Sequence, residues 1–154
     1  MEVVVEYGSI EREIHVDATL EVVYEVVSAP RHMAQWWSDE AEFEATPGAV
    51  GELAWGNREH VEAMTVVRAD PPRLFAFRWS YPDGTADEIA DSLLVTFELV
   101  PSGSGTLIRL TETGFREMGW AEAKLAQEYG EHVTGWDFYL PRLGEYVTRL
   151  VSAP

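Results

Sequence analysis

The last third of the chain carries one apolar stripe at helical spacing. Seven apolar side chains recur at alternating steps of four and three residues, which keeps them on one face of an α-helix. Almost everything before this helix has the shorter period of β-strands. A long helix with a partly aromatic face, following a run of strands, predicts a curved sheet around that helix with a cavity between the two. The stripe consists of Tyr129, Val133, Trp136, Leu140, Leu143, Val147 and Leu150.

The rest of the chain predicts two short helices among strands, which gives the α+β class. Asp17 or Thr19 can cap a helix that ends at Ser28, and Pro30 ends that helix or opens a second one. Alternating apolar and polar side chains, with turn residues between the runs, predict the strands. The order is therefore one strand, two helices, six strands and a long helix. Expected strands are 9–16, 41–45, 53–55, 59–69, 75–79, 93–99 and 106–113, and expected helices are 17–28, 30–37 and one from near Ala121.

Three local features qualify this pattern. We do not assign a buried face to the expected strand 59–69, because each of its two faces would carry both polar and apolar residues. Gly130 is expected to break or bend the long helix, and Pro141 is expected to kink it, because proline removes one backbone hydrogen bond. The polar stretch 81–91 is expected to form an excursion with a turn at 82–84.

The strong negative charge of the chain limits the kinds of molecule that it is expected to bind. Acidic residues number 27 against 11 basic ones, for a formal net charge of -16. Such a chain repels phosphate backbones and anionic membrane surfaces, so we expect no nucleic-acid partner and no membrane partner. With 154 residues, we expect one domain over 1–154 that is long enough to bury a core.

The absence of cysteine excludes disulfides, thiolate catalysis and cysteine zinc sites. The N-terminal run carries acids where a signal peptide carries bases, and no apolar run approaches the roughly 20 residues of a membrane helix. We therefore expect a cytoplasmic protein. The sequence holds no zinc-protease, Walker or serine-hydrolase motif, and the glycines around Ser104 form a hairpin tip. We expect no cofactor and no metal.

Several short segments, taken in their order along the chain, match the motifs of a known superfamily. They are 17–24 (aspxevw, with Tyr24 where tryptophan is usual), 32–37 (hxxxWW), 71–74 (PPxRL), 111–115 (TexGF) and 135–143 (GWxxxLxxL). On these segments the chain resembles the SRPBCC (START-like, birch-pollen-allergen-like) superfamily. Within it, the chain is most similar to the branch named for homologues of the activator of the 90-kDa heat-shock-protein ATPase.

The resemblance implies a helix-grip fold, in which a curved antiparallel sheet wraps around the long C-terminal helix. It also implies that lipids, polyketides or other apolar small molecules bind in the cavity under that helix. Some relatives are cyclases or hydrolases. The co-chaperone role of the namesake rests partly on an additional domain, which we do not expect in a chain of this length.

Large aromatic side chains are the main candidates for the cavity wall. They bury much area and offer flat surfaces to an apolar or ring-bearing ligand. The alternative is that they only fill the core, although six tryptophans are more than packing demands in so small a domain. The candidates are Trp36, Trp37, Trp55, Phe77, Trp79, Phe115 and Trp136, with Leu140 beside them on the long helix.

Glu112 and His60 are the leading polar candidates. By strand alternation, Glu112 lies on the inward face of its strand, so its carboxylate would be desolvated. It could then act as an acid or a base, or it could anchor a polar group of the ligand. The alternative is a carboxylate at the strand end that reaches solvent or pairs with an arginine. His60 forms a His-x-Glu pair with Glu62, which is too few ligands for a metal site. His132 either borders the cavity or has a structural role.

Three hypotheses follow, in order of preference. The first is a cytoplasmic module that binds a small apolar or aromatic molecule, held by burial of apolar area. The second is a cyclase-type or hydrolase-type enzyme in which Glu112 and a histidine or tyrosine act as acid and base in the same cavity. The third is a chaperone-associated interaction protein. We also consider a homodimer formed through the strand at Phe75 and the stretch 81–91.

Overall fold

One antiparallel sheet forms a complete layer of the molecule. A computed structural model describes residues 7–80 and 92–152. In these residues seven strands lie in the order β1-β7-β6-β5-β4-β3-β2, and every neighbouring pair is antiparallel. The strands are β1 (Ser9–Val16), β2 (Glu40–Glu42), β3 (Val50–Trp55), β4 (His60–Asp70), β5 (Leu74–Ser80), β6 (Leu94–Ser102) and β7 (Gly105–Thr113).

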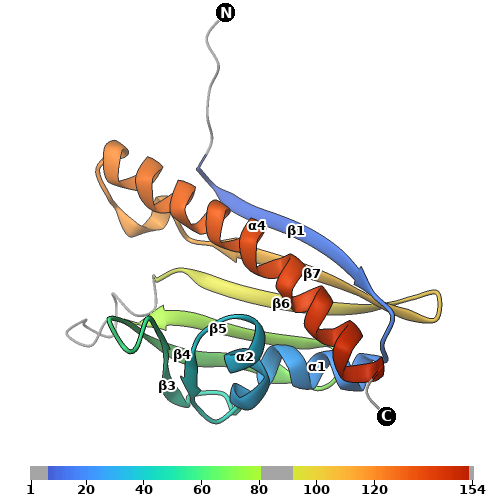
Figure 1. Ribbon diagram of the computed structural model, residues 1–154. Coiled ribbons are helices and arrows are strands. Elements are labelled where there is room, and N and C mark those ends of the chain that lie inside the picture. The colour runs from blue at the N-terminus through green and yellow to red at the C-terminus, as the bar shows by residue number, and fades with distance from the viewer. Residues whose placement is uncertain (1–6, 81–91, 153–154) are drawn as a thin grey trace, which may run out of the picture.

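The helices form a second layer against this sheet. The long C-terminal helix crosses the sheet obliquely, and two short helices lie near its C-terminal end (Figure 1). The sheet is open and curved, which confirms the α+β helix-grip fold expected from the sequence. The helices are α1 (Leu20–Ser28), α2 (Pro30–Trp36), the 3-10 helix η1 (Arg116–Met118) and α4 (Glu122–Ser152).

Local capping explains where the two short helices begin. The Thr19 side chain accepts a hydrogen bond from the backbone N–H of Val22 at 3.3 Å, which satisfies one free donor at the start of α1. Pro30 occupies the start of α2, where its missing N–H costs nothing. This helix ends at Trp36, one residue earlier than the sequence predicts, and Trp37 follows as its C-cap.

The strands β2 and β4 and the helix α4 show details that bear on the predictions from sequence. The strand predicted at 41–45 begins one residue earlier and ends three residues sooner, as β2 at the edge of the sheet. A register shift between Val66 and Arg68 interrupts the alternation of β4, which explains why its parity could not be assigned from sequence. The helix α4 is continuous, so Gly130 does not break it and Pro141 lies inside it. The stretch 81–91, with its expected turn, lies outside the described residues.

The apolar stripe of α4 is buried over its middle turns. Its four members from Trp136 to Val147 are at most 4% exposed, and they pack into the main core. Tyr129 and Val133 are partly buried against the same core. Leu150 is 37% exposed because it belongs to the last turn of the helix. The sheet and α4 therefore pack together over the turns from Trp136 to Val147.

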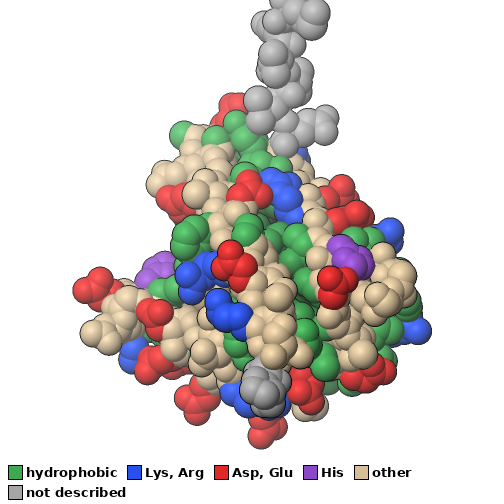
Figure 2. Space-filling view, turned by 45° about the vertical axis from the view of Figure 1, so that its right-hand side comes forward, with side chains coloured by type: hydrophobic (Ala, Val, Ile, Leu, Met, Phe, Trp, Pro, Cys, Tyr) green, Lys and Arg blue, Asp and Glu red, His purple; other side chains and the backbone are tan. Residues whose placement is uncertain are grey.

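Acidic side chains are spread over the surface and do not form one patch on the face drawn in Figure 2. Some of them pair with arginines. Arg58 contacts Glu40 at 3.1 Å and Glu52 at 2.6 Å, and Arg12 contacts Asp137 at 2.8 Å. These pairs are exposed, so each contributes little to stability.

Candidate functional site

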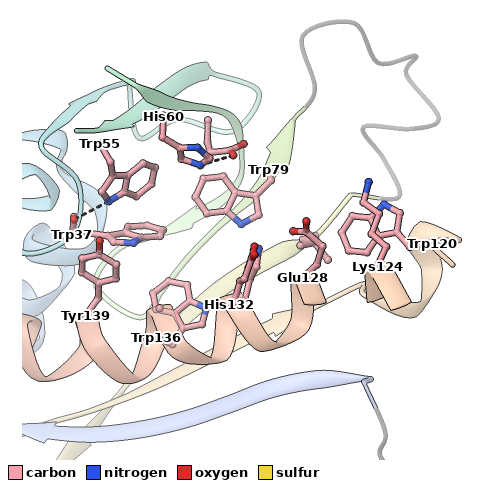
Figure 3. Close-up of a pocket in the computed structure, with 14 residues that line it drawn as sticks. Trp37, Trp55, His60, Trp79, Trp120, Lys124, Glu128, His132, Trp136 and Tyr139 are labelled. Carbon is pink, nitrogen blue, oxygen red and sulfur yellow. Dashed lines mark hydrogen bonds and ion pairs between the residues drawn. The ribbon is translucent and has the colours of Figure 1, made fainter. Parts of the chain in front are cut away.

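A pocket of about 580 Å³ lies between the sheet and α4. Aromatic side chains form most of its wall, and they converge from α4, from the strands and from the segment after α2 (Figure 3). This volume falls in the range that suits a small organic ligand. The lining residues are Trp37, Trp55, His60, Glu62, Trp79, Leu93, Trp120, Lys124, Glu128, Glu131, His132, Gly135, Trp136 and Tyr139.

Trp37 is the centre of the aromatic wall. Its ring centroid lies 5.0 Å from that of Trp136, 5.6 Å from that of Trp79 and 6.0 Å from that of Trp55. None of these pairs is a face-to-face sandwich, so they have the tilted and edge geometries that aromatic quadrupoles favour. The indole N–H of Trp55 donates to the backbone carbonyl of Trp37 at 3.1 Å, which fixes the two residues relative to each other.

Glu112 lies behind this wall and is 0% exposed. It stands on β7 between Ile10 of β1 and Val95 of β6, so apolar strands flank it on both sides. The burial confirms the inward parity that the sequence predicts for this position. Burial of an unpaired carboxylate costs several kcal/mol, and such a group persists only where hydrogen bonds compensate for the lost water.

Three nitrogen donors supply that compensation. Glu112 Oε2 accepts from the indole N–H of Trp79 at 2.9 Å, and Oε1 accepts from the indole N–H of Trp136 at 2.9 Å. Oε1 also bonds His132 Nδ1 at 2.8 Å. All three donors line the pocket, although Glu112 itself does not. One buried carboxylate on β7 therefore orients three side chains of the pocket wall, from β5 and α4.

His132 is the polar member of this group that reaches the pocket. Its side chain is 23% exposed, and its ring lies edge-on to Phe115 with centroids 5.4 Å apart. Figure 3 shows that Glu128, His132 and Trp136 rise from successive turns of α4 on the pocket side. An ionised carboxylate only accepts hydrogen bonds, so the network assigns a proton to His132 Nδ1.

Two opposing effects act on the charge of His132. Burial acts to lower the pKa of His132, but the hydrogen bond and charge of Glu112 act in the opposite direction. The charges of Glu128 and Glu62 add to the second effect, and the net result is a pKa of His132 raised above its usual value. The imidazolium form is thus favoured next to the buried carboxylate.

Charged side chains surround the mouth of the pocket. The His60 Nε2 atom lies 2.9 Å from Glu62 Oε1, and both side chains are partly exposed. The Lys124 ammonium lies 5.2 Å from the ring centroid of Trp120, within the range of a cation–π contact. Glu128 and Glu131 complete an acidic rim on α4.

The residues proposed from sequence fall into two groups. Trp37, Trp55, His60, Trp79 and Trp136 come together in the pocket lining. The remaining candidates are buried in the core and are not among the lining residues, although Glu112 bonds three that are. This second group consists of Trp36, Phe77, Glu112, Phe115 and Leu140.

Sequence reasoning did not single out Trp120, Tyr139 or Glu128. Trp120 precedes α4 in an irregular segment, where no periodicity indicates a direction. Glu128 and Tyr139 lie on α4 beside the apolar stripe, and their pocket side is a second face of the same helix. The spacing of Glu128, His132 and Trp136 at steps of four is the signal that marks this face.

Two further properties bear on function. Among the residues that the structure describes, no helix combines the length and apolar character needed to cross a bilayer. Within the same residues, no group of three or more His, Asp or Glu side chains is arranged to hold a metal ion.

Comparison with solved structures shows the same fold in distant proteins. A protein from Mesorhizobium loti is 18% identical, with a TM-score of 0.75 over 92% of this chain and 97% of that chain. The Aha1 dimer from Colwellia psychrerythraea is 16% identical, with a TM-score of 0.72 over 90% and 95% of the two chains. DynU16, a protein in the dynemicin biosynthetic locus, is 22% identical, with a TM-score of 0.70 over 92% of this chain and 47% of that chain.

Sequence comparison gives the family directly. No curated protein sequence matches the chain. The family model described as activator of Hsp90 ATPase homolog 1-like protein matches residues 17–148, which is most of the sequence. This agrees with the resemblance that the motifs indicate and with the shared fold. The chain belongs to the family of activator of Hsp90 ATPase homolog 1-like proteins.

Proposed function

We propose that the protein binds a small, largely apolar aromatic molecule in the pocket between the sheet and α4. One observation carries the proposal. Five of the six tryptophans of the sequence, together with Tyr139, line a single cavity of about 580 Å³. Aromatic side chains that only fill a core pack against one another and leave no space of this size between them.

Burial of the ligand against these rings supplies the affinity. Apolar area removed from water contributes about 25 cal/mol per Å², before the cost of ordering the ligand is subtracted. The indole groups of Trp55, Trp79 and Trp136 already donate to protein acceptors, so their rings need no partner from the ligand. The wall is thus both apolar and fixed in orientation.

The comparisons support a small-molecule role without naming a ligand. One structural neighbour, DynU16, is a protein of a biosynthetic locus. The catalytic hypothesis and the chaperone-associated hypothesis stay predictions, as does the homodimer, although the Aha1 neighbour is a dimer. The pocket itself is the feature that a first experiment must test.

A matched pair of glycines on α4 offers that test. Gly135 lines the pocket, Gly130 does not, and an added Cβ meets no atom within 4 Å at either position. Leucine is favourable in a helix interior, so both substitutions preserve α4. We expect Gly135→Leu to fill the pocket and weaken binding of the neutral dye N-phenyl-1-naphthylamine at least tenfold. Gly130→Leu is the control and keeps wild-type affinity, measured by dye fluorescence.

Native mass spectrometry of the freshly purified protein complements the titration. A retained small molecule, present in the wild type and lost in Gly135→Leu, identifies the class of the natural ligand. Equal dye affinity in wild type, Gly135→Leu and Gly130→Leu would show that the dye does not use this pocket, and would contradict the proposed site.

A further inference from the structure

Most polar atoms of the inner pocket wall are already engaged by the protein. The indole nitrogens of Trp55, Trp79 and Trp136 donate to Trp37 or to Glu112. The Nδ1 atom of His132 is held by Glu112, which leaves Nε2 as its other ring nitrogen. Across 7–80 and 92–152, no hydrogen-bond partner of His132 Nε2 is found.

We propose that His132 Nε2–H donates a hydrogen bond to an uncharged oxygen acceptor of the ligand, such as the carbonyl group of an aromatic ketone. Glu112 is the positioning residue that holds the imidazole in the orientation for this contact. The inference rests on the proposed function, because it assigns the polar end of a molecule whose rings occupy the tryptophan wall.

Glu112 decides which role Nε2 plays. Because a carboxylate only accepts hydrogen bonds, His132 carries a proton on Nδ1 whether the ring is neutral or charged. The Nε2 atom is therefore a donor in the imidazolium and an acceptor in the neutral ring. The surroundings raise the pKa of His132, which extends the donor state toward higher pH.

The charges that face His132 come from three elements. Glu112 lies on β7, Glu128 lies one turn away on α4, and Glu62 lies on β4. Glu112 balances the imidazolium charge, while Glu62 and Glu128 add negative potential to the pocket. An anionic ligand oxygen is repelled by these carboxylates, whereas a neutral carbonyl accepts from Nε2 without that cost.

A shape-matched pair of probes tests the inference. The ketone 2-acetylnaphthalene and the hydrocarbon 2-isopropylnaphthalene share a ring system and differ in one acceptor oxygen. Each is titrated against bound N-phenyl-1-naphthylamine at a series of pH values from about pH 6 to about pH 9. We expect the wild type to bind the ketone about tenfold more tightly than the hydrocarbon at the lowest pH, as a hydrogen bond to a charged group predicts. This preference falls as the pH rises, because deprotonation to the neutral ring makes Nε2 an acceptor.

Two variants distinguish the role of His132 as hydrogen-bond donor from the role of Glu112 as positioning residue. His132→Phe keeps a ring against Phe115 but removes the donor, so the ketone preference disappears at every pH in the series while the hydrocarbon still binds. Glu112→Gln removes the charge that favours the imidazolium, so the ketone preference is lost at a lower pH than in the wild type. A merely structural role of Glu112 would weaken both probes equally and would leave that pH unchanged. Glu145→Gln, at an exposed position of α4 outside the pocket lining, is the matched control and keeps the wild-type profile.

Binding of the hydrocarbon probe distinguishes a failure of the proposed function from a failure of the inference about His132. If neither probe displaces the dye, the proposed function fails together with this inference. If the hydrocarbon binds as tightly as the ketone at the lowest pH, the pocket stands and the assignment of His132 is overturned. Tighter binding of 2-naphthoate than of the ketone would also overturn it, because the ligand class would then be anionic. Should His132→Phe not fold, His132→Leu provides the same comparison, because leucine also lacks a donor.

Discussion

Glu112 shows how one residue can organise a pocket without lining it. Its carboxylate lies behind the wall and is bonded by two indoles and an imidazole, each from a side chain that faces the cavity. The interactions of a buried charge depend on one another, since removal of any partner leaves the others incompletely satisfied. The orientation of Trp79, His132 and Trp136 is thus determined jointly.

The charge state of His132 makes the stability of the fold depend on pH. Its pKa is raised in the folded protein, so its protonation stabilises the fold fully below the unfolded value of about 6.5. This contribution is lost as the pH rises through the higher, folded pKa. We expect urea unfolding at about pH 6 and about pH 9 to show a decrease in the free energy of unfolding for the wild type, and a smaller decrease for His132→Gln.

The pKa of His32 is shifted in the opposite direction to that of His132, which provides a comparison within the same protein. Burial and the charge of Arg31 lower the pKa of His32, although Glu25 acts in the other direction. Its contribution is therefore complete above about pH 6.5 and is lost as the pH falls through the folded pKa. His32 is present in both proteins, so the difference between them isolates His132. Identical pH profiles would contradict the assigned charge state.

At the scale of elements, α4 supplies the pocket with its polar and aromatic wall. The helix presents two faces to the interior, one that packs into the core and one that lines the cavity. Pro141 lies within this helix and has no backbone N–H, so the carbonyl of Asp137 receives no helical hydrogen bond from that position. The helix continues through Pro141 because packing of the flanking turns outweighs this loss.

Replacement of Pro141 is expected to stabilise the protein. Pro141→Ala restores a backbone donor at an exposed position inside α4, and it should raise the free energy of unfolding by about 1–3 kcal/mol. Thermal unfolding followed by circular dichroism measures the change. The control is Pro30→Ala, because proline at the start of α2 causes no such loss and its replacement should give no gain. A wild-type melting temperature in Pro141→Ala would contradict this account.

The sequence predicted the elements better than it predicted the pocket. Strand alternation and the α4 stripe gave the order of strands and helices and the inward direction of Glu112, because these depend on local period. The register shift in β4 and the short β2 escaped prediction, since register is decided by neighbouring strands. Phe77 and Phe115 were proposed as wall residues with the tryptophans, yet the alternation of residues along a strand predicts only that a side chain is buried. Whether it meets a cavity depends on how far α4 stands from the sheet.

At the scale of the whole molecule, charge is the dominant property. The formal net charge of -16 is only partly offset by exposed ion pairs such as Arg12 with Asp137. Like charges repel in the compact state more than in the expanded chain, and exposed pairs contribute little. Repulsion among carboxylates should therefore limit stability at low ionic strength.

Salt is expected to stabilise this protein. An increase from about 10 mM to about 500 mM sodium chloride shortens the screening length and weakens the repulsion. We expect the melting temperature to rise by about 2–4 °C, which corresponds to about 1 kcal/mol for a chain of this size. Choline chloride at equal ionic strength controls for specific sodium binding and should give the same rise. A decrease with either salt would show that the surface ion pairs outweigh the repulsion.

The concentration of tryptophans around one cavity has an optical consequence. Trp36 is the one tryptophan outside the pocket lining, so the near-ultraviolet absorption and emission of this protein come mainly from the walls of its cavity. Any occupant changes the polarity around five indoles at once. The natural ligand can accordingly be sought in fractionated extracts by the protein's own emission, with no label attached to either molecule.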